Sequence, residues 1–253
     1  MRKIDDTPAT LRAFGLLEAV AAAERPVTLA EAMATVGLPK PTVYRLFAQL
    51  EKAGLLAREP GTRRYTVGGR LARLGRNVML HSTVRAACHA VLQRLVEGVG
   101  ETCNLTMLEG AEVVYLDRVE SSWPLRISLS PGSHVPLHCS ASGKLLLALM
   151  PKAKRERVIS SLAFTGHTPS TITDPAAFEA ALAQVRAQRY ATDDEEYLAG
   201  LVCVAVPVVD AKGRPSAAVA VQAPAARMPL ATALTHLRGV RSAAEAIAPM
   251  FSD

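Results

Sequence analysis

The sequence predicts an α+β protein in which a small helical unit with one β-hairpin precedes a larger unit built on an antiparallel sheet. Three observations lead to this prediction. Apolar residues recur at helical spacing over most of residues 8–100, strand-like segments cluster only after residue 101, and two apolar strands near the end flank the hairpin-turn composition Asp210–Gly213. Strands and helices in separate clusters, with an antiparallel hairpin, are typical of α+β domains.

Composition and charge support a division of the chain into two parts. The chain has 253 residues, 49% of them hydrophobic, which suits one large or two small domains. Residues 1–80 contain 13 Lys and Arg against 7 Asp and Glu, whereas residues 81–253 contain 16 basic and 16 acidic residues. The whole net charge of +6 therefore lies in the first third, as expected of a module that neutralises DNA phosphates.

The first part predicts three helices and a hairpin. A first-turn proline begins an amphipathic helix over 8–24, a capping box begins a second helix over 28–37, and a third helix is expected over about 39–54. Short strands at 55–58 and 64–67 follow, with basic residues at the turn between them. Two helices joined by a tight turn and followed by a basic hairpin indicate a winged helix-turn-helix.

The third helix is the one that such a motif inserts into the major groove of DNA, with its N-terminal residues nearest the bases. Arg45 can donate two hydrogen bonds to a guanine, and Thr42 can contact a thymine methyl group or a phosphate. Arg63 and Arg64 in the hairpin are expected to contact phosphate or the minor groove. The alternative is that these cations are merely solvated and that Tyr44 packs on the hairpin. The candidate DNA-binding residues are Thr28, Lys40, Pro41, Thr42, Tyr44, Arg45, Gln49, Arg63 and Arg64.

The remaining elements complete the predicted organisation. A linker helix at 70–80 leads to a second helix with Val84, Cys88, Val91, Leu92 and Leu95 on one face. We then expect strands at 103–108, 113–119 and 126–129, helices at 144–150, 152–162 and 175–188, strands at 202–209 and 217–223, and a closing helix at 229–247. The predicted domains are a winged helix-turn-helix at 1–68, a linker helix at 69–82 and a larger domain at 83–253.

Alternation along the last two strands predicts two unlike faces. Valines at 202–206 and 218–222 alternate with the smaller or polar residues Cys203, Ala205, Ala218, Ala220 and Gln222. A face of small residues leaves room for a ligand, and tight packing in a core is the alternative explanation.

Segments of the sequence that could suggest catalysis or metal binding fit the known motifs poorly. The segment Ser140–Lys144 matches none of the nucleophile or phosphate-loop patterns. His134 and His138 would share a metal ion only on a helix, which Pro136 disfavours, and the acidic residues 193–196 are expected to be solvated or capping groups on a loop. The four cysteines form no C-x-x-C pair. We therefore expect no metal, no cofactor and no enzymatic activity.

Several motifs follow one another along the chain: Gly37–Lys40 with Thr42, Val43, Arg45 and Leu46, Val113–Glu120, Pro136–Cys139 with Ser142–Lys144, Thr171–Asp174, and Asp193–Glu196 with Gly200 and Cys203. Together they resemble the IclR family of bacterial transcription regulators over nearly all 253 residues. The resemblance implies an N-terminal winged helix-turn-helix, a linker helix and a C-terminal GAF-like domain that binds a small-molecule effector. It also implies a homodimer or a dimer of dimers that represses or activates catabolic operons.

The resemblance further implies where the effector binds. The implied contacts are Ile127, Val135, Ala141, Ser142, Gly143, Asp193, Cys203, Ala220 and Gln222. Free N–H groups at the helix start near Gly143 could hold a carboxylate. Family members that bind small keto acids have serines where Ala220 and Gln222 stand, which favours a larger, more apolar acid such as an aromatic carboxylate. Most members also have serine in place of Pro41, so a possible phosphate anchor is absent here.

These observations favour a cytoplasmic, ligand-responsive regulator that binds a palindromic operator in double-stranded DNA and takes a small organic acid as effector. No apolar run approaches the roughly 18 residues of a membrane span, so no membrane partner is expected. Two other classes stay open. One is an enzyme whose C-terminal domain transforms the small molecule, with the basic N-terminal domain as a targeting module. The other is an architectural protein that binds no ligand.

Overall fold

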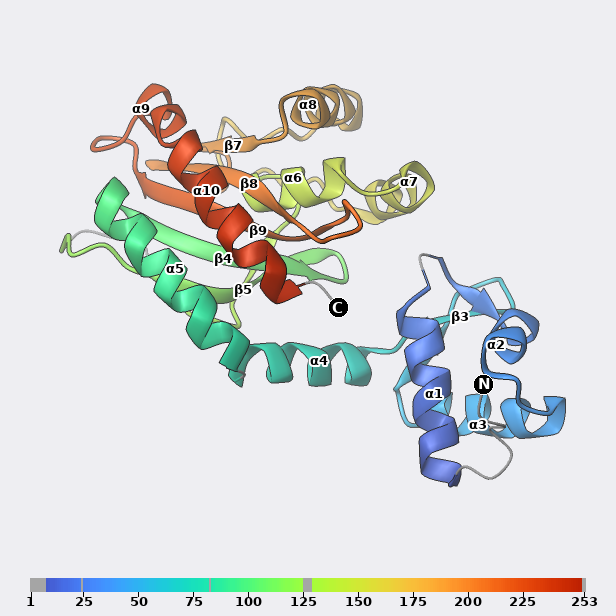
Figure 1. The fold of residues 1–253 in the computed structure, drawn as a ribbon. Coiled ribbons are helices and arrows are strands. Elements are labelled where there is room, and N and C mark those ends of the chain that lie inside the picture. Colours follow the sequence, from blue (N-terminus) through green and yellow to red (C-terminus); the bar gives the residue numbers. More distant parts are fainter. Residues whose placement is uncertain (1–7, 24, 82, 125–128, 252–253) are drawn as a thin grey trace. The chain divides into compact units, whose positions relative to one another are not determined.

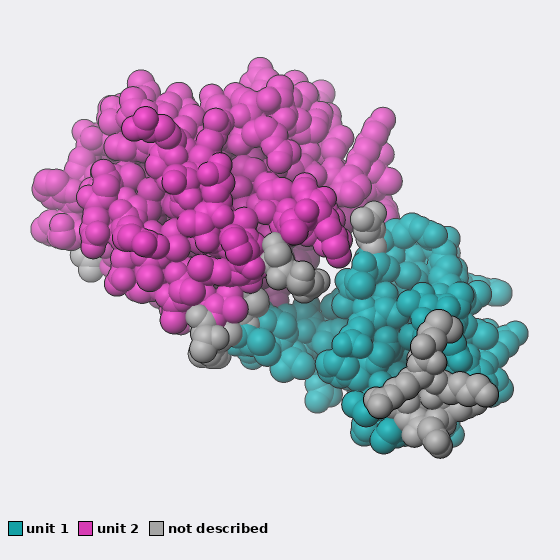
Figure 2. All heavy atoms as spheres, viewed as in Figure 1, with its two compact units in different colours: residues 1–78 teal, residues 79–253 magenta. Residues whose placement is uncertain are grey.

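The computed structural model describes residues 8–23, 25–81, 83–124 and 129–251, and the chain forms two compact units (Figure 2). Unit 1 comprises residues 1–78 and unit 2 comprises residues 79–253. The boundary falls near the end of the helix expected as a separate linker. Most of that helix therefore belongs to the first unit.

Unit 1 contains the expected helices and hairpin, with one additional short strand. Its elements are α1 (Ala9–Ala21), β1 (Val27–Thr28), α2 (Leu29–Val36), α3 (Lys40–Lys52), β2 (Leu56–Arg58), β3 (Arg64–Val67) and most of α4 (Gly69–His81). The strands form a small antiparallel sheet in the order β1-β3-β2. The first helix is shorter than the predicted 8–24, because Pro8 occupies the cap position before it and the helix ends at Ala21.

Local signals in the sequence set the ends of α2 and the orientation of α3. Thr28 and Glu31 form the predicted capping box, and Gly37, with φ of 67°, ends α2 in the left-handed conformation that glycine adopts without strain. Helix α3 buries Val43, Leu46, Phe47 and Leu50 in the core of unit 1. Its opposite face is consequently directed away from that core.

Unit 2 is a six-stranded antiparallel sheet with helices on both faces. Its elements are α5 (Thr83–Val99), β4 (Thr102–Glu109), β5 (Glu112–Val119), β6 (His134–Pro136), α6 (Ala141–Ala148), α7 (Lys152–Ser161), α8 (Pro175–Gln188), β7 (Ala191–Asp194), β8 (Leu201–Val209), β9 (Pro215–Pro224), α9 (Leu230–Thr235), α10 (Leu237–Ile247) and the 3₁₀ turn η2 (Ala248–Phe251). The strand order is β6-β5-β4-β9-β8-β7.

Four elements of unit 2 differ from the prediction. The short edge strands β6 and β7 were not expected, because each owes its strand conformation to pairing with a longer neighbour. The closing helix is broken at His236 into α9 and α10. The strand expected at 126–129 falls on residues 126–128, outside the described residues, and Leu129 is not in a strand.

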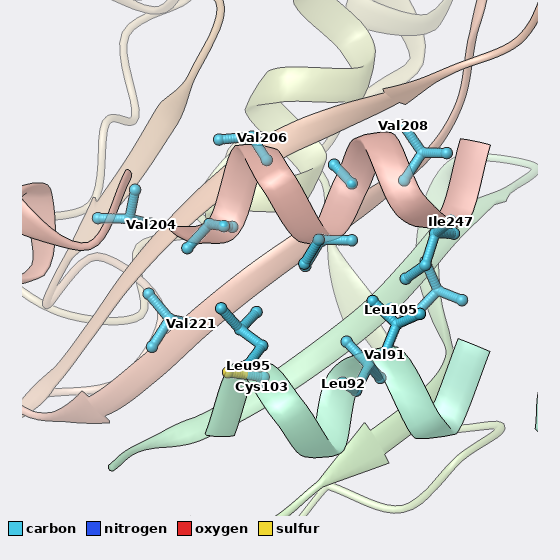
Figure 3. Close-up of a cluster of buried hydrophobic side chains, with 14 of the residues drawn as sticks. Val91, Leu92, Leu95, Cys103, Leu105, Val204, Val206, Val208, Val221 and Ile247 are labelled. Carbon is cyan, nitrogen blue, oxygen red and sulfur yellow. The ribbon is translucent and has the colours of Figure 1, made fainter. Parts of the chain in front are cut away.

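The two faces of the sheet carry the unlike residues that alternation predicted. Val204, Val206 and Val208 of β8 pack with α5 and α10 in one core (Figures 1 and 3). Cys203, Ala205, Ala218 and Ala220 pack with α6 and α8 in the other. Small side chains on the second face allow α6 to approach the sheet closely. Within the described residues, no helix is long and apolar enough to cross a bilayer.

Candidate functional site

The outer face of α3 presents most of the predicted DNA-binding residues to solvent. Lys40, Pro41, Arg45 and Gln49 are exposed and Thr42 is half-buried. Tyr44 is 53% exposed, so it is available for a contact and is not buried against the hairpin. The face has the length, charge and accessibility of a recognition helix.

The start of α3 offers little backbone capacity for a phosphate. Pro41 has no N–H, and Thr42 and Val43 both donate their N–H groups to the carbonyl oxygen of Pro39, at 3.0 and 3.1 Å. Among the described residues, only the N–H of Lys40 in this first turn lacks an acceptor. Affinity for phosphate at this helix must therefore come mainly from side-chain cations.

Two residues predicted to contact DNA, Thr28 and Arg64, also have partners within unit 1. The hydroxyl of Thr28 accepts the N–H of Glu31 at 3.2 Å within the capping box. Arg64 begins β3, and its guanidinium donates to the carbonyl oxygen of Pro26 at 2.9 Å and lies 3.3 Å from the Glu31 carboxylate. The hydrogen bonds from Thr28 and the neighbouring Arg25 lower the pKa of Glu31 to about 2, so this partner remains charged.

The Arg64 guanidinium thus links β3 to the segment before α2 and to Glu31 of α2, and its contact with phosphate or the minor groove stays a prediction. Arg63 is exposed in the turn, and its contact with phosphate or the minor groove stays a prediction. Arg58 at the end of β2 is also exposed, although its Nε donates to the carbonyl oxygen of Thr62 at 3.2 Å. The sequence did not single out Arg58, because it stands in a predicted strand like any other strand residue.

Unit 2 encloses a small cavity between the start of α6 and the strands of the sheet. Its volume is about 20 Å³, enough for about one water molecule. The predicted residues that line it are Val135, Ala141, Ser142, Asp193, Cys203, Ala220 and Gln222. The lining also includes Val113, Tyr115, Ser140, Tyr197 and Leu201, which were not among the predicted effector contacts. Alternation along β5 could have identified Val113 and Tyr115, since they face opposite to Val114 and Leu116.

The small-residue face leaves less room than expected. Ala205 and Ala218 pack beneath α6 and α8, so for them tight core packing is the correct explanation. Cys203 and Ala220 belong to the same core and also line the cavity. Space remains only at the end of this face, beside the first turn of α6.

Gly143 has a structural role at this turn and is not in the cavity lining. A Cβ at this position would lie 2.4 Å from the carbonyl oxygen of Leu137, so glycine alone permits this close approach. Its N–H donates to the Ser140 hydroxyl at 3.2 Å and is therefore not free for a ligand, contrary to expectation. The N–H groups of Ala141 and Ser142, the first two positions of α6, have no acceptor among the described residues. Ile127, also predicted to bind the effector, lies outside the described residues.

A chain of buried hydrogen bonds orients the amide of Gln222. Arg118 donates to the Asn104 oxygen at 3.0 Å, which turns the Asn104 NH₂ group toward the Gln222 oxygen at 2.9 Å. The Tyr115 hydroxyl also donates to that oxygen, at 3.4 Å. A guanidinium group can only donate, so Arg118 fixes the direction of donation along these hydrogen bonds. The NH₂ group of Gln222 has no acceptor among the described residues and is left for a ligand.

Asp193 lies on the edge strand β7, paired with Cys203, and not on a loop as expected. It is only 2% exposed, and its carboxyl accepts the N–H groups of Glu196 at 2.8 Å and Tyr197 at 3.3 Å. Burial raises the pKa of Asp193 to about 7, despite these hydrogen bonds. Nearby, Glu196 forms a buried ion pair with Lys144. Three of the four acidic residues expected to be solvated or capping groups are thus at least half-buried.

A wider groove of about 560 Å³ lies on the opposite face of unit 2, between α5 and α10. Its polar lining residues, including Arg94, His236 and Arg238, are not buried. The small cavity differs in having buried polar groups that converge on it, as ligand sites do.

Comparison with known proteins agrees with this architecture. The model of the IclR helix-turn-helix domain matches residues 9–60, and that of the bacterial transcriptional regulator IclR C-terminal domain matches residues 77–249. The chain belongs to the IclR family. This IclR-family protein is 46% identical over 245 residues to "Probable transcriptional regulator SauR" of Cupriavidus necator, with 97% of each chain covered.

Solved structures of the family have the same fold. IclR of Thermotoga maritima is 28% identical with a TM-score of 0.64, covering 95% of this chain and 97% of that one. The transcriptional regulator RHA06195 of Rhodococcus sp. RHA1 is 25% identical with a TM-score of 0.66, covering 96% and 97%. The predicted α+β architecture and family are confirmed. The IclR-family protein is a transcriptional regulator with a helix-turn-helix DNA-binding domain, and it is not an enzyme.

Proposed function

We propose that this regulator binds a palindromic operator as a homodimer, or as a dimer of dimers, and that a small organic acid in the cavity beside α6 changes its affinity for that operator. It would act in the cytoplasm on a catabolic operon. The observation that carries the effector proposal is the arrangement of hydrogen-bond donors around the cavity.

Most of the unpaired polar groups at the cavity donate. They are the Gln222 NH₂ group, the Ser142 hydroxyl and the N–H groups of Ala141 and Ser142 at the positive end of α6. Asp193 adds a fifth donor group when protonated, which its raised pKa allows near neutral pH. A carboxylate only accepts hydrogen bonds and carries the charge that a helix start favours. The cavity therefore suits a carboxylate better than an amine or an alcohol.

The size of the cavity favours a short acid over the aromatic one expected from the sequence. A benzene ring occupies a cavity of about 150 Å³, against about 20 Å³ here. Any organic acid requires the cavity to open, and a short chain requires the least opening. A ligand that binds only an open state shifts the population toward that state, which is the physical basis for a response at the DNA-binding domain.

Unit 1 carries apolar side chains that a second subunit would cover. Leu11 and Phe14 on α1, and Leu74 and Val78 on α4, are all exposed. Exposed apolar side chains gathered on two helices are typical of protein interfaces. Pairing these helices between two chains would hold two copies of α3 at the fixed separation that a palindromic operator requires.

The test compares the wild type with Gln222→Glu. The new carboxylate still accepts hydrogen bonds from Asn104 and Tyr115, and it replaces the free donor with a negative charge that repels an anionic ligand. Thermal unfolding and operator gel shifts are measured against a panel of two- to five-carbon acids and benzoate. We expect a short acid to shift both in the wild type, and neither in the variant.

The matched control is Gln184→Glu, the same change at an exposed position of α8. It should respond to the acid like the wild type. A Gln222→Glu variant that also responds like the wild type would place the effector elsewhere, with the groove between α5 and α10 as the next candidate. A response to benzoate alone would overturn the preference for a short acid.

A further inference from the structure

Three potential metal ligands from separate segments meet in unit 2. His138 and Cys139 lie in the turns between β6 and α6, and His167 lies between α7 and α8. One ligand atom of each, drawn from the ring nitrogens and the sulfur, lies within 4.8 Å of the other two. His138 and Cys139 are buried, whereas His167 is exposed. The cluster therefore has a fixed inner part and one side chain at its solvent edge.

The hydrogen bond of His138 leaves a ring nitrogen ready to bind a metal. Its Nε2 lies 2.9 Å from the carbonyl oxygen of Thr165. A carbonyl oxygen can only accept, so Nε2 carries the proton and Nδ1 carries the lone pair. Metal-ligating histidines commonly donate their second N–H to a carbonyl or carboxylate in this way, which sets both the tautomer and the ring orientation.

The spacing of the three side chains is close to that of a tetrahedral site. With metal–nitrogen bonds of about 2.1 Å and a metal–sulfur bond of about 2.3 Å, neighbouring ligand atoms of a tetrahedron lie about 3.4–3.7 Å apart. The atoms here lie within 4.8 Å of one another, so the site closes with a movement of about 1 Å. The exposed His167 can make this movement by a small change of its side-chain torsions.

We propose that His138, Cys139 and His167 bind a zinc ion, with a fourth position left to water or a small ligand. A thiolate with two imidazoles is a zinc-type donor set, whereas Mg²⁺ and Ca²⁺ prefer oxygen. Three protein ligands with an open position distinguish this site from a closed structural one.

No metal was expected from the sequence, because Pro136 disfavours the helix on which His134 and His138 could share an ion. In the structure His134 Nε2 contacts the Glu109 carboxylate at 2.8 Å. His167, which lies far along the chain, supplies the second imidazole.

One aromatic contact connects this site to the cavity. The His167 ring packs edge-on against Tyr197, with 5.6 Å between ring centroids, and Tyr197 lines the cavity. Cys139 also lies directly before Ser140, the cap of α6. A bound ion that holds His167 would therefore restrict the two segments that form one side of the cavity.

The experiment titrates metal-free, untagged full-length protein with Co²⁺, followed by Zn²⁺ in competition. We expect one equivalent of Co²⁺ to give the intense visible bands of tetrahedral coordination and a near-ultraviolet thiolate-to-cobalt charge-transfer band, both abolished by Zn²⁺. His167→Ala should weaken Co²⁺ binding at least about tenfold, and Cys139→Ser should remove the charge-transfer band.

His236→Ala, at a histidine outside the cluster, is the matched control and should bind like the wild type. Since His167 is exposed, its substitution leaves the core intact even if Cys139→Ser does not fold. The proposal is overturned if the wild type gives no charge-transfer band, or if His167→Ala binds Co²⁺ as tightly as the wild type. The metal titration needs neither operator nor effector, so its outcome is independent of the proposed regulatory function.

Discussion

Ionisation of Asp193 should make the free energy of unfolding depend on pH, because folding removes its carboxyl group from water. Denaturation experiments can measure this dependence. Asp193→Asn keeps an oxygen that can accept the N–H groups of Glu196 and Tyr197 and removes the ability to ionise. The charged neighbours that act on Asp193 are Glu196, which raises its pKa, and Lys144, which lowers it. Both remain in the variant, so the difference between the two proteins isolates the Asp193 carboxyl group.

The magnitude follows from the two pKa values. Burial raises the pKa of Asp193 from 3.8 to about 7. Between these values the unfolded chain has released the proton while the folded chain retains it. The contribution to stability is therefore fully present below pH 3.8 and is lost as the pH rises through about 7. Each pH unit in this window is worth about 1.4 kcal/mol, so the free energy of unfolding falls by about 4 kcal/mol across the window and by about 2 kcal/mol between about pH 5.5 and 8.

Urea denaturation at several pH values tests this reasoning. The free energy of unfolding of Asp193→Asn, relative to wild type, should increase by about 2 kcal/mol on going from about pH 5.5 to 8. The same substitution at the exposed Asp194 should not change the pH dependence. Wild-type and Asp193→Asn stabilities that run parallel across this range would refute the assignment of a buried, protonated carboxyl group.

Four further outcomes are expected. Arg45→Ala should weaken binding to the operator by about 1–3 kcal/mol and leave binding to random DNA nearly unchanged in gel shifts; equal losses would make Arg45 a phosphate contact. Arg63→Ala should weaken binding to all sequences and reduce the slope of log K against log salt by about 0.9 per lost contact, and an unchanged slope would count against a phosphate contact. Gly143→Ala should lower the free energy of unfolding by about 1–3 kcal/mol or more, because the added methyl group would lie 2.4 Å from the Leu137 oxygen. Leu74→Glu should favour the 26.9 kDa monomer in sedimentation, whereas a persistent dimer would place the interface elsewhere.

Elements that are determined by residues close together in the chain could be predicted directly from the sequence. The Thr28 capping box and the glycine at the end of α2 act within a few residues, so they predicted where α2 begins and ends. The apolar spacing of α3 likewise predicted which of its faces is exposed. Strand alternation likewise predicted the valine and small-residue faces of β8 and β9, because side chains on a strand must alternate wherever the strand is placed.

Properties that depend on distant segments required the folded chain. The acidic residue Asp193 reads as a solvated loop residue, yet pairing with β8 places it inside the protein and raises its pKa. The contacts of Arg64 with the Pro26 carbonyl oxygen and the Glu31 carboxylate arise only in the folded chain, and His138 gains His167 as a neighbour only through packing. The position of the first turn of α6 beside the cavity depends on the close approach of Gly143 to Leu137, in the turn after β6. Periodicity specifies which face a residue occupies, whereas burial, partners and free volume are set by contacts between segments that lie far apart in the chain.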